Sequence, residues 1–89
     1  MKNHEQIKQI LSQMADVLQQ CHLDEWAVRL GTFCTSLDTD PVATKSSILS
    51  LYGGMGSIND IVLYRNMQPL IAENQIFDQL REQLYSLVR

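Results

Sequence analysis

Apolar residues recur at spacings of three and four over the first part of the chain. The set is Ile7, Ile10, Leu11, Met14, Val17, Leu18 and Cys21. This spacing places side chains on one face of a helix, while polar residues occupy the other face. The pattern predicts an amphipathic helix from about His4 to Gln20 that needs a neighbouring element to cover its apolar stripe.

A second helix is predicted from Asp24 to Ser36, with Asp24 as its N-cap. Its inward positions are Trp26, Ala27, Leu30, Phe33, Cys34 and Leu37. Gly31 lies inside this helix, where glycine costs about 1 kcal/mol relative to alanine. That position indicates either close packing against another helix or simple tolerance of glycine.

The letters "DTDP" mark the clearest boundary in the chain. Asp40 is predicted to cap the next helix, and Pro41 suits its first position, where a missing N–H is no loss. This third helix is predicted from Pro41 to Leu51. Its expected inward residues are Val42, Ile48, Leu49 and Leu51, with Tyr52 as a further candidate.

The remainder of the chain contains one ambiguous segment and one clear helix. The run "IVLY" within residues 61–67 is β-branched and aromatic, as in a strand, but no partner strand is evident, which favours a short helix beginning near Ser57. The last helix has Pro69 in its first turn and buries Leu70, Ile76, Phe77, Leu80, Leu84, Leu87 and Val88. The sequence therefore predicts one all-α domain over residues 1–89, a small compact bundle of four to five helices.

The segment "SLYGGMGSINDIVLY", residues 50–64, places three glycines within four residues. Gly53 is predicted to close the third helix in the left-handed conformation that glycine adopts without penalty. Ser57 is predicted to cap the next helix, with Asp60 completing a start signal that resembles a capping box. Met55 either fills an irregular gap in the core or forms an exposed apolar contact.

These glycines do not match a phosphate-binding loop. Such a loop needs a lysine that reaches the phosphates, whereas "GGMGSIND" contains none and Asp60 adds negative charge. Histidines, cysteines and acids lack the spacing of a metal site. His22 adjoins Cys21 in sequence, yet neighbours on a helix point in different directions. We therefore expect no catalytic, cofactor-binding or metal-binding residues, and a protein that is not an enzyme.

Composition agrees with a folded domain, since 45% of the 89 residues are hydrophobic and 19% are charged. No segment approaches the roughly 20 apolar residues that cross a bilayer, and the first residues lack the apolar run of a signal peptide. These features predict a cytoplasmic protein that does not associate with membranes, with Cys21 and Cys34 as reduced thiols.

The net charge is -3, and no block of basic residues is present to neutralise a nucleic-acid backbone. Between Asp16 and Asp60, six acids stand against two bases: Asp16, Asp24, Glu25, Asp38, Asp40 and Asp60 against Arg29 and Lys45. An acidic region of this kind can steer a basic partner. The alternative explanation of the same acids, and the simpler one, is that they lie on ordinary solvated helix faces. Direct nucleic-acid binding is not expected in either case.

The stretch "SILSLYGGMGSINDIVLY", residues 47–64, resembles a family of small, all-helical bacterial proteins with a Gly-Gly-Met-Gly-Ser turn followed by Asn-Asp and aliphatic residues. Some small helical proteins of this appearance act as immunity proteins that neutralise toxin domains of contact-dependent growth inhibition and related polymorphic toxin systems. The resemblance implies a cognate toxin as partner, with a basic nuclease domain such as a ribonuclease of the EndoU type.

Two functions are therefore expected from the sequence. The first is an immunity protein that blocks a toxin, with partner contacts at Asp38, Asp40, Tyr52, Met55, Asn59 and Asp60. The four residues near the glycine corner serve either as a docking edge or only as parts of the turn. The second is a self-associating or regulatory helical module without a toxin partner, in which glutamine-rich helix faces pack in a homodimer.

Overall fold

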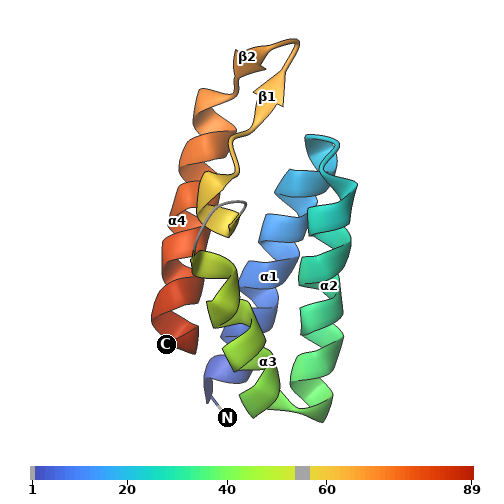
Figure 1. The fold of residues 1–89 in the computed structure, drawn as a ribbon, viewed down its shortest axis with the longest axis vertical. Helices are drawn as coiled ribbons and strands as arrows, with labels where there is room; N and C mark the ends of the chain where they lie inside the picture. Colours follow the sequence, from blue (N-terminus) through green and yellow to red (C-terminus); the bar gives the residue numbers. More distant parts are fainter. Residues whose placement is uncertain (1, 54–56) are drawn as a thin grey trace.

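Four α-helices and a short hairpin form the fold in a computed structural model that describes residues 2–53 and 57–89 (Figure 1). The helices are α1 (Lys2–Gln20), α2 (Asp24–Thr39), α3 (Pro41–Leu49) and α4 (Ile71–Val88). Two 3-10 turns, η1 (Ser50–Tyr52) and η2 (Ile58–Asp60), follow α3, and the strands are β1 (Tyr64–Arg65) and β2 (Gln68–Pro69). The prediction of a small all-α bundle is confirmed.

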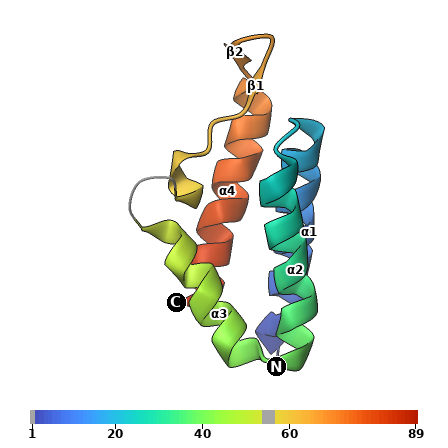
Figure 2. The same ribbon diagram turned by 45° about the vertical axis from the view of Figure 1, so that its right-hand side comes forward.

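The apolar stripe of α1 lies at the centre of the bundle. α1 packs against α2 and α4, while α3 packs against α2 and α4 on the other side (Figures 1 and 2). The buried core consists of Ile7, Ile10, Leu11, Met14, Leu18, Leu30, Leu37, Ile48, Leu51, Ile58, Leu63, Phe77, Leu80, Leu84 and Val88. Every helix therefore contributes its apolar face to one core, as the spacing of these residues predicts. No helix in the described residues is long and apolar enough to span a bilayer.

α1 ends in a Schellman motif centred on His22. The backbone N–H of Leu23 donates to the carbonyl of Leu18 at 2.9 Å, and that of His22 donates to Gln19 at 3.1 Å. His22 has φ 63°, the left-handed conformation that glycine usually provides at this position. Because Leu23 takes the N-cap position of α2, Asp24 is the first helical residue, and the N-cap makes no side-chain hydrogen bond. The prediction of Asp24 as N-cap is wrong.

The boundary between α2 and α3 is the predicted one. Asp40 caps α3 by accepting a hydrogen bond from the Ala43 N–H at 3.2 Å, and Pro41 is the first helical residue. A Cβ at Gly31 would have no heavy atom within 4 Å, so of the two alternatives for this glycine the structure favours simple tolerance over close packing. The prediction that Val42 is buried is wrong. Val42 is 72% exposed, because α3 buries Thr44 and Ile48, two and six residues further on.

The glycine corner differs from the prediction at its first residue. Gly53 is extended, with φ -120° and ψ 148°, because the 3-10 turn η1 has already ended the helix. Ser57 caps η2 as predicted, by accepting a hydrogen bond from the Asn59 N–H at 3.2 Å. Gly54, Met55 and Gly56 lie outside the described residues, and so does the predicted contact at Met55.

The segment after η2 is a hairpin and not the predicted short helix. Tyr64 pairs with Pro69, and Arg65 pairs with Gln68. Asn66 and Met67 form the turn, with φ 53° and 65°, as in a type I′ turn. Pro69 therefore belongs to β2, and α4 begins at Ile71.

α4 buries most of the residues predicted to face the core. Phe77, Leu80, Leu84 and Val88 are buried. Ile76 is 49% exposed, because it is rotated by about 100° from the neighbouring Phe77, which points into the core. The prediction that Ile76 is buried is therefore wrong.

The side chain of Asn74 attaches the hairpin to α4. Its Oδ1 accepts a hydrogen bond from the Leu63 N–H at 2.8 Å, and its Nδ2 donates to the carbonyls of Leu63 at 3.0 Å and Leu70 at 2.8 Å. The Leu70 N–H also donates to the Leu63 carbonyl at 2.9 Å. A two-residue ladder is too short to be stable alone. The amide of Asn74 supplies the missing backbone partners.

Candidate protein-binding site

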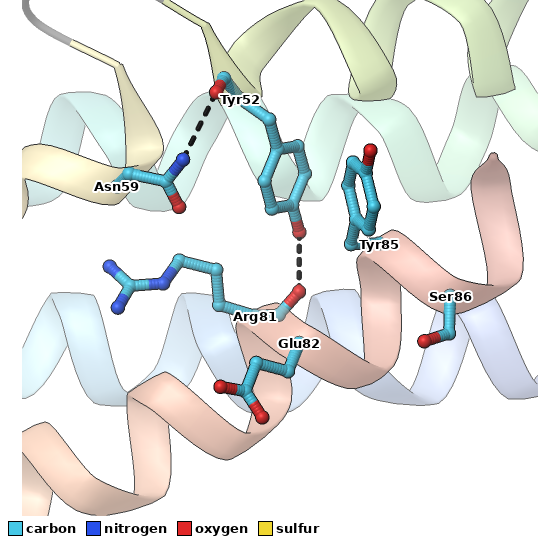
Figure 3. A pocket seen from close by; sticks show the side chains of 6 residues that line it. All are labelled: Tyr52, Asn59, Arg81, Glu82, Tyr85 and Ser86. Atoms are coloured by element: carbon cyan, nitrogen blue, oxygen red, sulfur yellow. Dashed lines mark hydrogen bonds between the residues drawn. The ribbon is translucent and has the colours of Figure 1, made fainter.

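η1, η2 and α4 together form an open hollow, which we call the Tyr52 hollow. It has a volume of about 480 Å³ and is lined by Tyr52, Asn59, Arg81, Glu82, Tyr85 and Ser86 (Figure 3). Tyr52 and Asn59 belong to the contacts predicted from the sequence. The structure brings these two residues together and adds four side chains from α4.

Tyr52 is held in place at both ends. Its hydroxyl donates a hydrogen bond to the Arg81 carbonyl at 2.7 Å, and its own carbonyl accepts one from Asn59 Nδ2 at 3.0 Å. Burial raises the pKa of the Tyr52 phenol well above its ordinary value, while nearby Arg81 acts in the opposite direction. The phenol is therefore a protonated donor near neutral pH, and its ring forms a fixed wall of the hollow.

Arg81 is also committed to internal contacts. Its Nη1 donates to the Ile58 carbonyl at 3.1 Å, its Nη2 pairs with the Asp78 carboxylate, and its guanidinium lies 5.8 Å from the Phe77 ring centre. These contacts join α4 to η2 and offset the positive charge of Arg81. Arg81 therefore acts as a structural residue in this wall.

A second group of side chains in the hollow is available for contacts. Glu82, Tyr85 and Ser86 lie three and four residues apart on α4, which places them on one face. Within residues 2–53 and 57–89, neither the Glu82 carboxylate nor the hydroxyls of Tyr85 and Ser86 form a hydrogen bond or ion pair. The Tyr52 and Tyr85 ring centres are 5.1 Å apart, with the planes tilted by 58°.

Asp38 and Asp40 lie elsewhere, around the junction of α2 and α3. Asp38 pairs with Lys8 Nζ at 3.0 Å and with His4 Nε2 at 3.1 Å. The hydrogen bond from Lys8, and then that from His4, lowers the pKa of the Asp38 carboxyl. Asp40 caps α3. Since α3 alone is about 14 Å long, these acids and the Tyr52 hollow do not form one compact site.

Asp60 and Asn59 are adjacent in η2 but line different hollows. Asp60 lines a smaller hollow of about 290 Å³ with Leu23, Trp26, Ser57, Ile61 and Val62. The other acids of the predicted acidic region are also spread out. Asp24 and Glu25 begin α2, whereas Asp38 lies near its end, about 20 Å further along the helix. The acidic region is therefore not a single acidic patch.

Both cysteines are free and half-buried. Burial raises the pKa of the Cys34 and Cys21 thiols, and Cys34 Sγ lies 3.7 Å from the Lys8 carbonyl. In the described part of the chain, no three histidine, cysteine or acidic side chains gather in a way that could hold a metal ion.

A described family of proteins matches this chain. Its description is "Domain of unknown function (DUF6966)", and it matches residues 19–71, more than half of the 89 residues. The chain belongs to the DUF6966 family. No curated protein and no solved structure matches the chain significantly.

The DUF6966 match extends from the end of α1 to the first residue of α4. It includes Tyr52 and Asn59, whereas Glu82, Tyr85 and Ser86 follow it. These three α4 residues were not predicted from the sequence. The available signal was an aromatic residue, Tyr85, close to the acidic Glu82 on one face of the last helix.

Proposed function

We propose that this DUF6966 protein is an immunity protein that binds and neutralises a cognate bacterial toxin domain. The toxin is a ribonuclease, such as one of the EndoU type, and neutralisation occurs by steric and electrostatic blockade. In this role the protein acts by binding and needs no catalytic group of its own.

The observation that carries the proposal is the construction of the Tyr52 hollow. Tyr52 and Asn59 are held by hydrogen bonds within the protein, so little side-chain freedom is lost when a partner binds. Tyrosines in recessed, well-packed positions often supply much of the binding energy of an interface. Tyr85 and Glu82 add an open aromatic ring and a carboxylate on the same side.

Charge supports the same proposal. A ribonuclease must present a basic surface to its RNA substrate, and the net charge of this chain is -3. Complementary charge raises the rate of association and helps to exclude wrong partners. The Glu82 carboxylate lies beside the aromatic pair, where it can meet a basic residue of the toxin.

The test is coexpression with the toxin domain encoded by a neighbouring reading frame. We expect coexpression to restore growth, and calorimetry to give a complex that weakens as salt rises, since salt screens exposed charges. Tyr85→Ala should weaken binding at least about tenfold, as expected for an interface anchor. Gln83→Ala, at the neighbouring exposed position of α4, is the matched control. No binding to that toxin and no rescue of growth would refute the proposal.

A second candidate function is self-association, favoured by exposed apolar side chains around the hairpin. Val62, Tyr64, Met67 and Ile71 are 48%, 54%, 95% and 72% exposed. Neighbouring apolar residues of this kind mark interaction surfaces in many proteins. Light scattering over a range of concentrations would show a dimer that Met67→Ser weakens. A monomer at every concentration would exclude this function.

A further inference from the structure

We infer that the Tyr52 hollow receives one cationic side chain, a lysine or an arginine, from the protein partner. The identity of that partner rests on the proposed function, whereas the cation specificity follows from the hollow itself. Figure 3 shows the aromatic rings of Tyr52 and Tyr85 side by side, with Glu82 and Ser86 on the adjoining turns of α4.

The available polar groups in the hollow are suited to a cation. Glu82 offers a carboxylate that only accepts hydrogen bonds, and the hydroxyls of Tyr85 and Ser86 can accept as well. Within the described residues these groups have no internal partners. An ammonium or guanidinium group consists only of donors, so it is the kind of group that these acceptors can bind.

The aromatic rings favour the same ligand. Cations are attracted to the face of a tyrosine ring at distances up to about 6 Å from its centre. In this chain the Arg89 guanidinium already lies 5.9 Å from the Tyr85 ring centre. Tyr52 is fixed through its hydroxyl, so its ring can form a cation contact without first becoming ordered.

The positive charge of Arg81 does not exclude a second cation. Arg81 is paired with Asp78 and donates to the Ile58 carbonyl, so its charge is offset inside the wall of the hollow. Within the described residues the Glu82 carboxylate forms no ion pair, and the Arg89 guanidinium lies near the Tyr85 ring. The hollow, at about 480 Å³, is within the size range of small-ligand sites and has room for one long side chain.

The experiment titrates the protein with blocked single amino acids and follows the tyrosine ring signals by NMR. The probes are N-acetyl-lysine methylamide and N-acetyl-arginine methylamide, and the control is the lysine probe acetylated at Nζ, which has the same length but no charge. We expect saturable shifts of the Tyr52 and Tyr85 signals with the charged probes only. Equal shifts with the neutral probe, or no shifts, would overturn the inference.

Two matched variants complete the test. Glu82→Gln should weaken the binding of the charged probes about fivefold, which is the upper effect of a solvent-accessible ion pair. Glu25→Gln removes the same charge at an exposed position on α2 and should leave the affinity for these probes unchanged. Equal affinity in both variants would contradict the inference.

The two proposals fail in different ways. A toxin that binds wild type and Glu82→Gln equally well would contradict the cation site and leave the immunity function in place. Charged probes that bind while the toxin does not would refute the immunity function and leave the cation site in place.

Discussion

Replacing Asn74 with aspartate tests whether one side-chain amide holds the hairpin to α4. The two residues have the same shape, but an ionised carboxylate cannot donate. The bond from the Leu63 N–H would remain, whereas the bonds to the carbonyls of Leu63 and Leu70, at 3.0 and 2.8 Å, would become contacts between acceptors.

The expected loss of stability follows from these contacts. Two lost hydrogen bonds cost about 1 kcal/mol each, and two part-buried acceptors left facing a carboxylate add about 1 to 2 kcal/mol more. A negative charge in the first turns of α4 interacts favourably with the helix dipole and stabilises the protein by about 0.5 kcal/mol. Asn74→Asp should therefore destabilise the protein by about 3 kcal/mol at neutral pH, which lowers Tm by roughly 12 to 24 °C in a domain of this size.

The assay is urea and thermal unfolding followed by circular dichroism. Gln75→Glu adds the same charge at the next, exposed position of α4 and should change stability by less than about 0.5 kcal/mol. Because the surrounding carbonyls favour a protonated carboxyl, the pKa of the introduced group is raised in the folded state. The loss of stability caused by Asn74→Asp should therefore be smallest below about pH 4, where the carboxyl is protonated in both states. It should grow as pH rises from about 4 through the raised pKa. A loss under about 1 kcal/mol would refute the reasoning.

Three further changes test other contacts. His22→Gly should stabilise the protein by about 1 kcal/mol in urea unfolding, since φ 63° costs glycine nothing; equal or lower stability contradicts this. Tyr52→Phe should cost about 1 kcal/mol in the same assay, because it removes the hydroxyl bond to the Arg81 carbonyl; an unchanged urea midpoint contradicts this. Asp38→Asn should reduce the acid sensitivity of the urea midpoint. The contribution of Asp38 is complete above its unfolded pKa of about 3.9 and is lost as pH falls through its lowered folded pKa; a variant with the same acid sensitivity as wild type contradicts this.

Local signals in the sequence predict the helices and their main boundary well. The stripe of α1 and the Asp40-Pro41 start of α3 depend only on neighbouring residues, and both are found in the structure. Val42 and Ile76 were assigned to the core wrongly, because the rotation of a helix about its axis is set by the elements packed against it. The hairpin was missed since its ladder has two residues per strand and depends on Asn74.

The candidate site was only half predictable for a similar reason. Tyr52 and Asn59 are close in sequence and lie around one turn, so their association could be inferred from the glycine segment. Glu82 and Tyr85 reach the same hollow from α4, and no local pattern links residues about thirty positions apart. The predicted acids at Asp38 and Asp40 were separated from the hollow by the length of α3.

Trp26, the single tryptophan of the chain, gives the molecule a fluorescent reporter in addition to the NMR signals of its tyrosine rings. Its ring is half-buried beneath the Arg29 guanidinium, 4.7 Å away, and lines the smaller hollow beside Ile61 and Val62. Tryptophan emission therefore senses whether the segment after η2 stays docked on α2. The ring signals of Tyr52 and Tyr85 sense the other hollow. Local opening of the loop and occupation of the tyrosine pair can thus be recorded separately in one sample.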